Sequence, residues 1–155
     1  MNAFNEAERK GREKLKRDYD NSIFPIDYYF TPDEYNKIDS FATAHTPGGD
    51  IKMANEVKNR DIYIASYSAS GFILEVIKKD ALMEAHDNSG YCPYYTNYFI
   101  DGRIVWDLRK IKDLDDRIIT KECTRTTATN YGDRVPKKVI LLYPNEGKIT
   151  YYYNN

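Results

Sequence analysis

The chain has 155 residues and a formal net charge of −1 at pH 7. This length fits one domain that can bury a core of its own without disulfides or a structural metal. The balanced charge gives no global sign of a strongly basic nucleic-acid binder, so only local clusters of basic residues could indicate that function.

Targeting and cysteine patterns predict a cytoplasmic protein. The chain has no run of 18 apolar residues and its first twenty residues are charged throughout, so we expect neither a membrane span nor a signal peptide. Cys92 and Cys123 lack CxxC spacing, and we interpret both as ordinary thiols. No Pro/Gly/Ser-rich linker divides the chain, which predicts a single domain over residues 1–155.

The first half of the chain predicts a helix followed by a β-hairpin. Residues 3–19 space their apolar side chains at helical intervals with charges elsewhere, which is typical of an amphipathic helix. A connector with one short strand is expected over residues 22–35. Residues 36–44 and 51–59 have strand character, and "HTPGGD" between them has the composition of a hairpin turn.

The second half predicts one more helix and then further strands. Residues 71–85 place apolar side chains at i, i+3 and i+4, so we expect a helix over the whole segment. Residues 94–108 predict a hairpin around Asp101-Gly102, and residues 137–153 predict another around "PNEG". The order helix, hairpin, helix and further strands is typical of an α/β (α+β) domain with a mixed sheet.

An acidic residue two positions before a lysine occurs four times, at Glu8, Asp50, Glu56 and Glu146. Only Glu56 falls within an expected strand, where residues i and i+2 share a face. The Glu56 carboxylate and the Lys58 ammonium are therefore expected to stand side by side.

The hairpin turn predicts which residue faces Glu56. If the turn is centred between Pro47 and Gly48, paired positions sum to 95 and Asp39 lies opposite Glu56. Opposed residues have Cβ atoms about 4.5 to 5.5 Å apart, so two carboxylates would meet unless a cation lay between them. Mg²⁺ prefers carboxylate oxygens and water, and Lys58 would orient or activate a water beside it. The alternative is a solvated sheet face on which the lysine merely neutralises the acids.

With Asp39, Glu56 and Lys58 so placed, the sequence resembles the PD-(D/E)XK nuclease superfamily, whose core is a helix, a hairpin of strands, another helix and a further strand. The resemblance covers roughly residues 3–108 and implies a restriction-endonuclease-like core, to which residues 117–153 add a C-terminal β-hairpin extension. It implies that Asp39 and Glu56 bind a divalent metal, Mg²⁺ or alternatively Mn²⁺, and that Lys58 acts on the attacking water.

The resemblance implies two further site residues. Many members, including Holliday junction resolvase-like ones, add a metal-binding Glu from the first helix. Glu8 matches because it lies about 20° from Leu15 around the helix; the alternative is an ion pair with Arg12 at i+4. Lys78 matches a lysine of the second helix near substrate phosphate, with a solvated helix residue as the alternative.

One feature departs from the family pattern, because no Pro precedes Asp39. A Pro32-Asp33 pair lies upstream. Pairing Asp33 with Glu56 would centre the turn outside the Gly-rich segment, which favours Asp39.

Basic residues gather in two segments that could contact a phosphate backbone. Residues 9–17 concentrate six of them beside Glu8, and residues 103–112 supply a second patch that is followed at once by "DLDDR". The candidates for DNA contact in the first segment are Arg9, Lys10, Arg12 and Lys14. A solvated helix face balanced by acids is the alternative. No appended base-reading module is visible in the sequence, which favours recognition of DNA structure or backbone.

The resemblance implies a Mg²⁺-dependent deoxyribonuclease that serves recombination, replication or repair in a bacterium or phage. A phage-encoded protein would act in the host cytoplasm, and two-fold substrates such as junctions would suit a homodimer. One alternative is a catalytically inactive nuclease-like binding protein, acting as an inhibitor or assembly component. The other is a toxin-type RNase, for which His45 and His86 lack an evident acid–base partner in the sequence.

Overall fold

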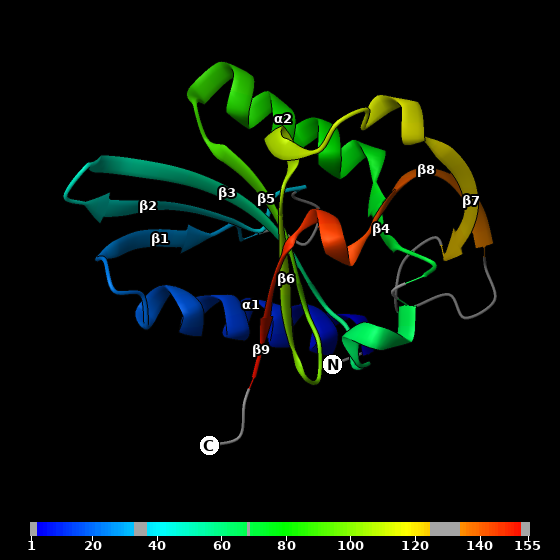
Figure 1. Ribbon diagram of the computed structural model, residues 1–155, viewed down its shortest axis with the longest axis horizontal. Helices are drawn as coiled ribbons and strands as arrows, with labels where there is room; N and C mark the ends of the chain where they lie inside the picture. The colour runs from blue at the N-terminus through cyan, green and yellow to red at the C-terminus, as the bar shows by residue number, and fades with distance from the viewer. Residues whose placement is uncertain (1–2, 33–36, 68, 125–133, 153–155) are drawn as a thin grey trace.

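Two α-helices cover opposite sides of a mixed sheet, and a smaller sheet lies beside it (Figure 1). The computed structural model describes residues 3–32, 37–67, 69–124 and 134–152, and these counts refer to them. The helices are α1 (Ala3–Asp20), as predicted, and α2 (Val76–Ser89). This arrangement confirms the predicted mixed α/β class. Neither helix is long and apolar enough to cross a membrane.

The main sheet has the strand order β1-β2-β3-β5-β6-β9 among the described residues. Neighbouring strands are antiparallel, except that β5 runs parallel to β3 with α2 in the connection between them. The predicted hairpin around Asp101-Gly102 is present as β5 and β6. The strands are β1 (Ile26–Phe30), β2 (Ser40–Thr46), β3 (Gly49–Asn59), β5 (Cys92–Tyr98), β6 (Gly102–Asp107) and β9 (Lys148–Tyr151).

The β2–β3 hairpin has the predicted register. Thr46 pairs with Gly49 and Ser40 with Asn55, so the paired positions sum to 95 and the turn falls at Pro47-Gly48. The ladder ends at Ser40, and the next residue, Asp39, stays beside β3 because its amide donates to the Asn55 carbonyl at 3.0 Å. The sequence therefore predicted the neighbourhood of Asp39 correctly.

The helix predicted over residues 71–85 is wrong in its first turn. Residues Phe72–Glu75 form strand β4, which alternates buried and half-buried side chains and pairs with β8 (Arg134–Leu142). Aromatic and β-branched side chains suit such a strand. The helix begins only after it, and ends at Gly90, whose left-handed conformation (φ 73°) is typical of a helix C-terminus.

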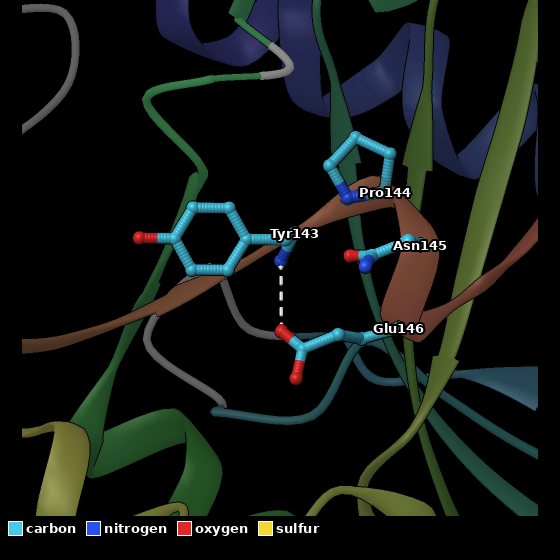
Figure 2. Close-up of a pocket in the computed structure, with 4 residues that line it drawn as sticks. All are labelled: Tyr143, Pro144, Asn145 and Glu146. Atoms are coloured by element: carbon cyan, nitrogen blue, oxygen red, sulfur yellow. Dashed lines mark hydrogen bonds between the residues drawn. The ribbon is translucent and has the colours of Figure 1, made fainter.

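The hairpin predicted around "PNEG" is also wrong, because its two strands belong to different sheets. β8 pairs with β4 and with β7 (Ile119–Thr124), whereas β9 pairs with β6 of the main sheet. Between them the chain makes a tight turn in which the Tyr143 amide donates to Glu146 Oε1 at 3.1 Å (Figure 2). The C-terminal extension is therefore divided, and its hairpin is β7–β8.

Two apolar clusters fix the helices on the sheet. The larger, which includes Trp106, Phe72 and Leu82, lies on the α2 side and joins the main sheet to β4 and β8. The smaller includes Leu15 of α1 and Val57 of β3. Alternate residues of β3 thus face opposite helices, which brings side chains of both helices to the end of the hairpin.

Candidate functional site

Asp39 lies at the open end of the β2–β3 hairpin and is only 5% exposed. Its Oδ2 accepts a hydrogen bond from the Val57 amide at 2.9 Å, a backbone donor beyond the last β2–β3 ladder pair. Its Oδ1 accepts one from Arg12 Nη2, also at 2.9 Å. A strand amide and a guanidinium from α1 thus hold this carboxylate in place.

Glu56 is 4% exposed and lies beside Asp39. Its Oε1 accepts from Lys78 Nζ at 2.5 Å, whereas its Oε2 is buried with no hydrogen-bond partner among the described residues. Burial raises the pKa of this carboxyl well above its usual range, and the charge of Asp39 raises it further. The site therefore contains a buried acid pair with one carboxylate oxygen left over.

Lys58 follows Glu56 by two residues and points to the same side of β3, where it is half-buried. Within the described part of the chain its ammonium has no hydrogen-bond or ion-pair partner. Burial lowers the pKa of Lys58 to about 8, and the positive charges of Arg60 and Lys78 contribute. An amine with such a pKa can give up or take a proton near neutral pH.

Lys78 belongs to the cluster and is not a solvated helix residue. Its side chain crosses from α2 to Glu56. Burial lowers its pKa, but the Glu56 carboxylate outweighs that effect and the net shift is upward. The ammonium therefore stays charged and supplies the positive charge that the buried acid requires.

Glu75 and Lys137 are members of the cluster that the sequence did not reveal. Glu75 is the last residue of β4, and its Oε1 accepts a hydrogen bond from Lys137 Nζ of β8 at 2.8 Å. Burial raises the pKa of Glu75, but Lys137, Lys78 and Lys58 together lower it below its usual value. Reading residues 71–85 as one helix concealed this role, since only the strand brings Glu75 beside β8.

Glu8 reaches the acid pair through Arg12. Its Oε1 lies 3.4 Å from Arg12 Nη2, the same nitrogen that contacts Asp39. Arg12 also donates from Nη1 to the Thr31 carbonyl at 2.7 Å. The i, i+4 pairing expected as the alternative is therefore present, and it places the Glu8 carboxylate at the rim of the site.

The other basic residues predicted to contact DNA are arranged differently from one another. Arg9 is exposed and forms ion pairs with acids one turn before and one turn after it on α1. Lys14 donates to Asn59 Oδ1 at 2.6 Å and so lies in the contact between α1 and β3. Lys10 is half-buried. Asp33, the alternative to Asp39, lies outside the described residues.

The donor set suits a hard cation that keeps much of its water. Two carboxylates face each other, and oxygen ligands with several retained waters are the usual arrangement for Mg²⁺. Among the described residues, no three His, Cys, Asp or Glu side chains are grouped so as to hold a metal ion. Arg12 and Lys78 already neutralise the two acids, so a cation bound there would compete with both.

A hollow at the turn after β8 contains none of the predicted site residues. It is lined by Tyr143, Pro144, Asn145 and Glu146 (Figure 2). The Glu146 carboxylate accepts hydrogen bonds from Arg117 through both oxygens, at 2.7 and 2.5 Å. This acid is thus committed to holding the turn, which explains why the fourth acid-x-Lys tripeptide contributes no candidate site.

Comparisons of the chain with protein-family models, with curated proteins and with solved structures found no match. Function must therefore be inferred from the residues and from their geometry.

Proposed function

We propose that the protein is a Mg²⁺-dependent deoxyribonuclease of the PD-(D/E)XK type, with Mn²⁺ able to replace Mg²⁺. The observation that carries the proposal is the buried pair of Asp39 and Glu56 at the end of a hairpin, with Lys58 two positions further along β3. The order α1, β2–β3 hairpin, α2 and β5 supports a restriction-endonuclease-like core.

The free oxygen of Glu56 supports a cation between the acids. Asp39 and Glu56 would hold it, and Glu8 could add a ligand only by giving up its contact with Arg12. When bound, Mg²⁺ supplies charge neutralisation for the phosphoryl transition state and lowers the pKa of a water. Two acids with a shared charge deficit give such an ion a reason to bind.

Lys58 is suited to hold the attacking water and accept its proton. With a pKa of about 8, about one tenth of the amine is neutral at pH 7. Lys78 remains protonated beside Glu56, so it can offer positive charge to the scissile phosphate. These roles predict large losses of activity with the fold retained.

A nuclease-like binding protein without catalysis is the second candidate. The observation that favours it is that Asp39 and Glu56 already have cationic partners, at 2.9 and 2.5 Å. The cluster would then stabilise the end of the hairpin only. The protein would act through protein or nucleic-acid contacts, as an inhibitor or an assembly component.

The setting belongs to the same proposal. A small nuclease without an appended base-reading module would be directed by DNA structure or backbone, in phage or bacterial recombination, replication or repair. The charged N-terminal segment supports a cytoplasmic location. A homodimer would suit two-fold substrates such as junctions.

Cleavage assays separate the two candidates. Supercoiled, linear, single-stranded and branched DNA would be incubated with the protein in Mg²⁺ or in EDTA. The parent should cleave at least one substrate in Mg²⁺ and none in EDTA, and Glu56→Ala and Lys58→Met should lose about 100-fold or more. Glu84→Ala removes an exposed acid of α2 and serves as the control.

Cleavage by Glu56→Ala at the parental rate would contradict the nuclease proposal. Retained DNA binding with no cleavage of any substrate would assign the binding role instead. Circular dichroism of each variant would show whether the fold is intact.

A further inference from the structure

One face of the small sheet adjoins the acid pair. Glu75 of β4 pairs with Val139 of β8, and Lys137 of β8 pairs with Lys121 of β7. Paired residues, and residues two apart on a strand, share a face, so these four side chains lie on the same face. The hydrogen bond from Lys137 to Glu75 agrees with this geometry.

This face is continuous with the proposed catalytic cluster. The Glu75 carboxylate lies among the ammonium groups of Lys137, Lys78 and Lys58, and Lys78 contacts Glu56. Figure 1 shows the same relationship, with β4, β8 and β7 side by side next to the start of α2. A chain of charged side chains thus runs from β3 to β7.

Cations outnumber acids along this path. The cations are Arg12, Lys58, Arg60, Lys78, Lys121 and Lys137, and the acids are Glu8, Asp39, Glu56 and Glu75. The whole chain carries a formal net charge of −1, so this excess is local. A local positive excess attracts polyanions even when the net charge is negative.

Lys121 has no partner that would explain its position. It is exposed, and none of the described residues accepts a hydrogen bond from it or forms an ion pair with it. Like charges directly opposite each other destabilise an antiparallel pair. An anion lying over Lys121 and Lys137 would remove that repulsion.

We propose that Lys121 and Lys137, on the paired strands β7 and β8, bind the phosphate backbone of the nucleic acid whose scissile bond reaches Asp39 and Glu56. The choice of polymer rests on the proposed function. Lysine ammonium groups act as point charges toward phosphate and read no base sequence. The C-terminal hairpin would therefore extend the substrate contact beyond the catalytic cluster and strengthen binding without adding sequence preference.

Binding is best measured in EDTA, where cleavage does not interfere. A fluorescein-labelled 30-base-pair duplex and a 30-nucleotide single strand would be titrated with the protein at several salt concentrations, and anisotropy recorded. Lys121→Glu should weaken duplex binding at least fivefold. Lys121→Ala with Lys137→Ala should reduce the log–log salt slope by about 2, since each phosphate contact contributes about 0.9.

Lys138→Glu is the matched control. Lys138 is exposed and follows Lys137 directly, but it pairs with Thr120 and so points to the opposite face. The charge change is the same as in Lys121→Glu, and affinity should stay within twofold of the parent. Equal weakening by the two substitutions, or none by either, would overturn the proposal. Binding of phosphatidylserine vesicles through Lys121, without binding of either oligonucleotide, would overturn it too.

Failure of this inference and failure of the nuclease proposal are distinguishable. Binding that depends on Lys121, in a protein that never cleaves DNA in Mg²⁺, supports the surface and removes the nuclease. Cleavage by a protein whose binding is indifferent to Lys121 keeps the nuclease and removes the surface. Thermal unfolding of each variant should match the parent, because the substituted side chains lie outside the buried core.

Discussion

Asp39 and Glu56 are buried side by side, yet each is neutralised from a different side of the sheet. Arg12 of α1 reaches Asp39, and Lys78 of α2 reaches Glu56. The two acids therefore tie both helices to the same end of the hairpin. Any ligand that replaces one of these cations will change how a helix is held, so the stability of the fold reports on the state of the site.

Lys58→Met should stabilise the metal-free protein. A buried ammonium whose pKa falls from 10.5 to about 8 opposes folding at pH 7, by about 2 kcal/mol after allowance for its partial exposure. Above pH 8 the folded chain has lost this proton while the unfolded chain keeps it up to about pH 10.5. The free energy of unfolding of the parent should thus rise with pH across this window.

Urea unfolding in EDTA at pH 7 and pH 9.5 would measure both effects. The advantage of Lys58→Met should shrink at the higher pH. A variant less stable than the parent at pH 7 would show that the ammonium stabilises the fold.

Mg²⁺ should stabilise the parent but not Asp39→Asn. Saturation at 100 times the Kd adds about 2.7 kcal/mol, which corresponds to about 5 to 10 °C in Tm for a chain of this size. Replacing one of the two carboxylates removes a ligand and most of that gain. Differential scanning fluorimetry in Mg²⁺ and in EDTA measures it, with exposed Glu84→Gln as the control. An equal rise in Asp39→Asn would locate the cation elsewhere.

The geometry of the acids could be predicted because it depends on local rules. The Gly-rich turn sets the register of a two-stranded ladder, and the period of two decides which side chains share a face. Those two rules place Asp39 beside Glu56, as the structure does. The partners Arg12 and Lys78 depend on how the helices pack, and no spacing in the sequence encodes that.

The errors in the fold have a common cause. Phe72, Ile73 and Val76 satisfy helical spacing as well as strand alternation, and the choice was made by β8, which lies more than sixty residues later. Likewise, "PNEG" carries a local hairpin signal, but β4 and β6 compete for the flanking strands. Pairing between distant segments overrode local preference, and the role of Glu75 became visible only with it.

Arg12→Ala should destabilise the fold by about 3 kcal/mol, because it leaves the carboxylate of Asp39, which is 5% exposed, without its cation. The bond to the Thr31 carbonyl is lost as well. Arg9→Ala removes an arginine of the same helix whose ion pairs are exposed, and should cost less than 1 kcal/mol. Urea unfolding of both variants compares them. Equal losses would contradict the assignment of Arg12 as the holder of the acid pair.

His45 should make stability depend on pH near neutrality. It lies in β2 and not in the predicted loop, and its two ring nitrogens are 2.8 Å from Asp27 and 2.9 Å from Asp50. Hydrogen bonds to Asp27 and Asp50 raise its pKa above 6.5. The contribution is fully present below pH 6.5 and is lost as pH rises through the folded-state pKa. Thermal unfolding from pH 5.5 to 8.5 should show this decline in the parent, and its persistence in His45→Gln would exclude the histidine as the cause.

Gly102→Ala should test whether the C-terminal strand belongs to the main sheet. A Cβ atom at Gly102 would lie 2.3 Å from the Thr150 carbonyl oxygen of β9, a backbone contact that cannot be relieved by a side-chain rotation. We expect a loss of about 2 kcal/mol or more, because β9 must move away from β6. Gly48→Ala is the matched control, since its Cβ would meet nothing closer than 3.9 Å. Chemical unfolding should separate the two variants clearly. Equal stability would mean that β9 does not pack against β6 in solution.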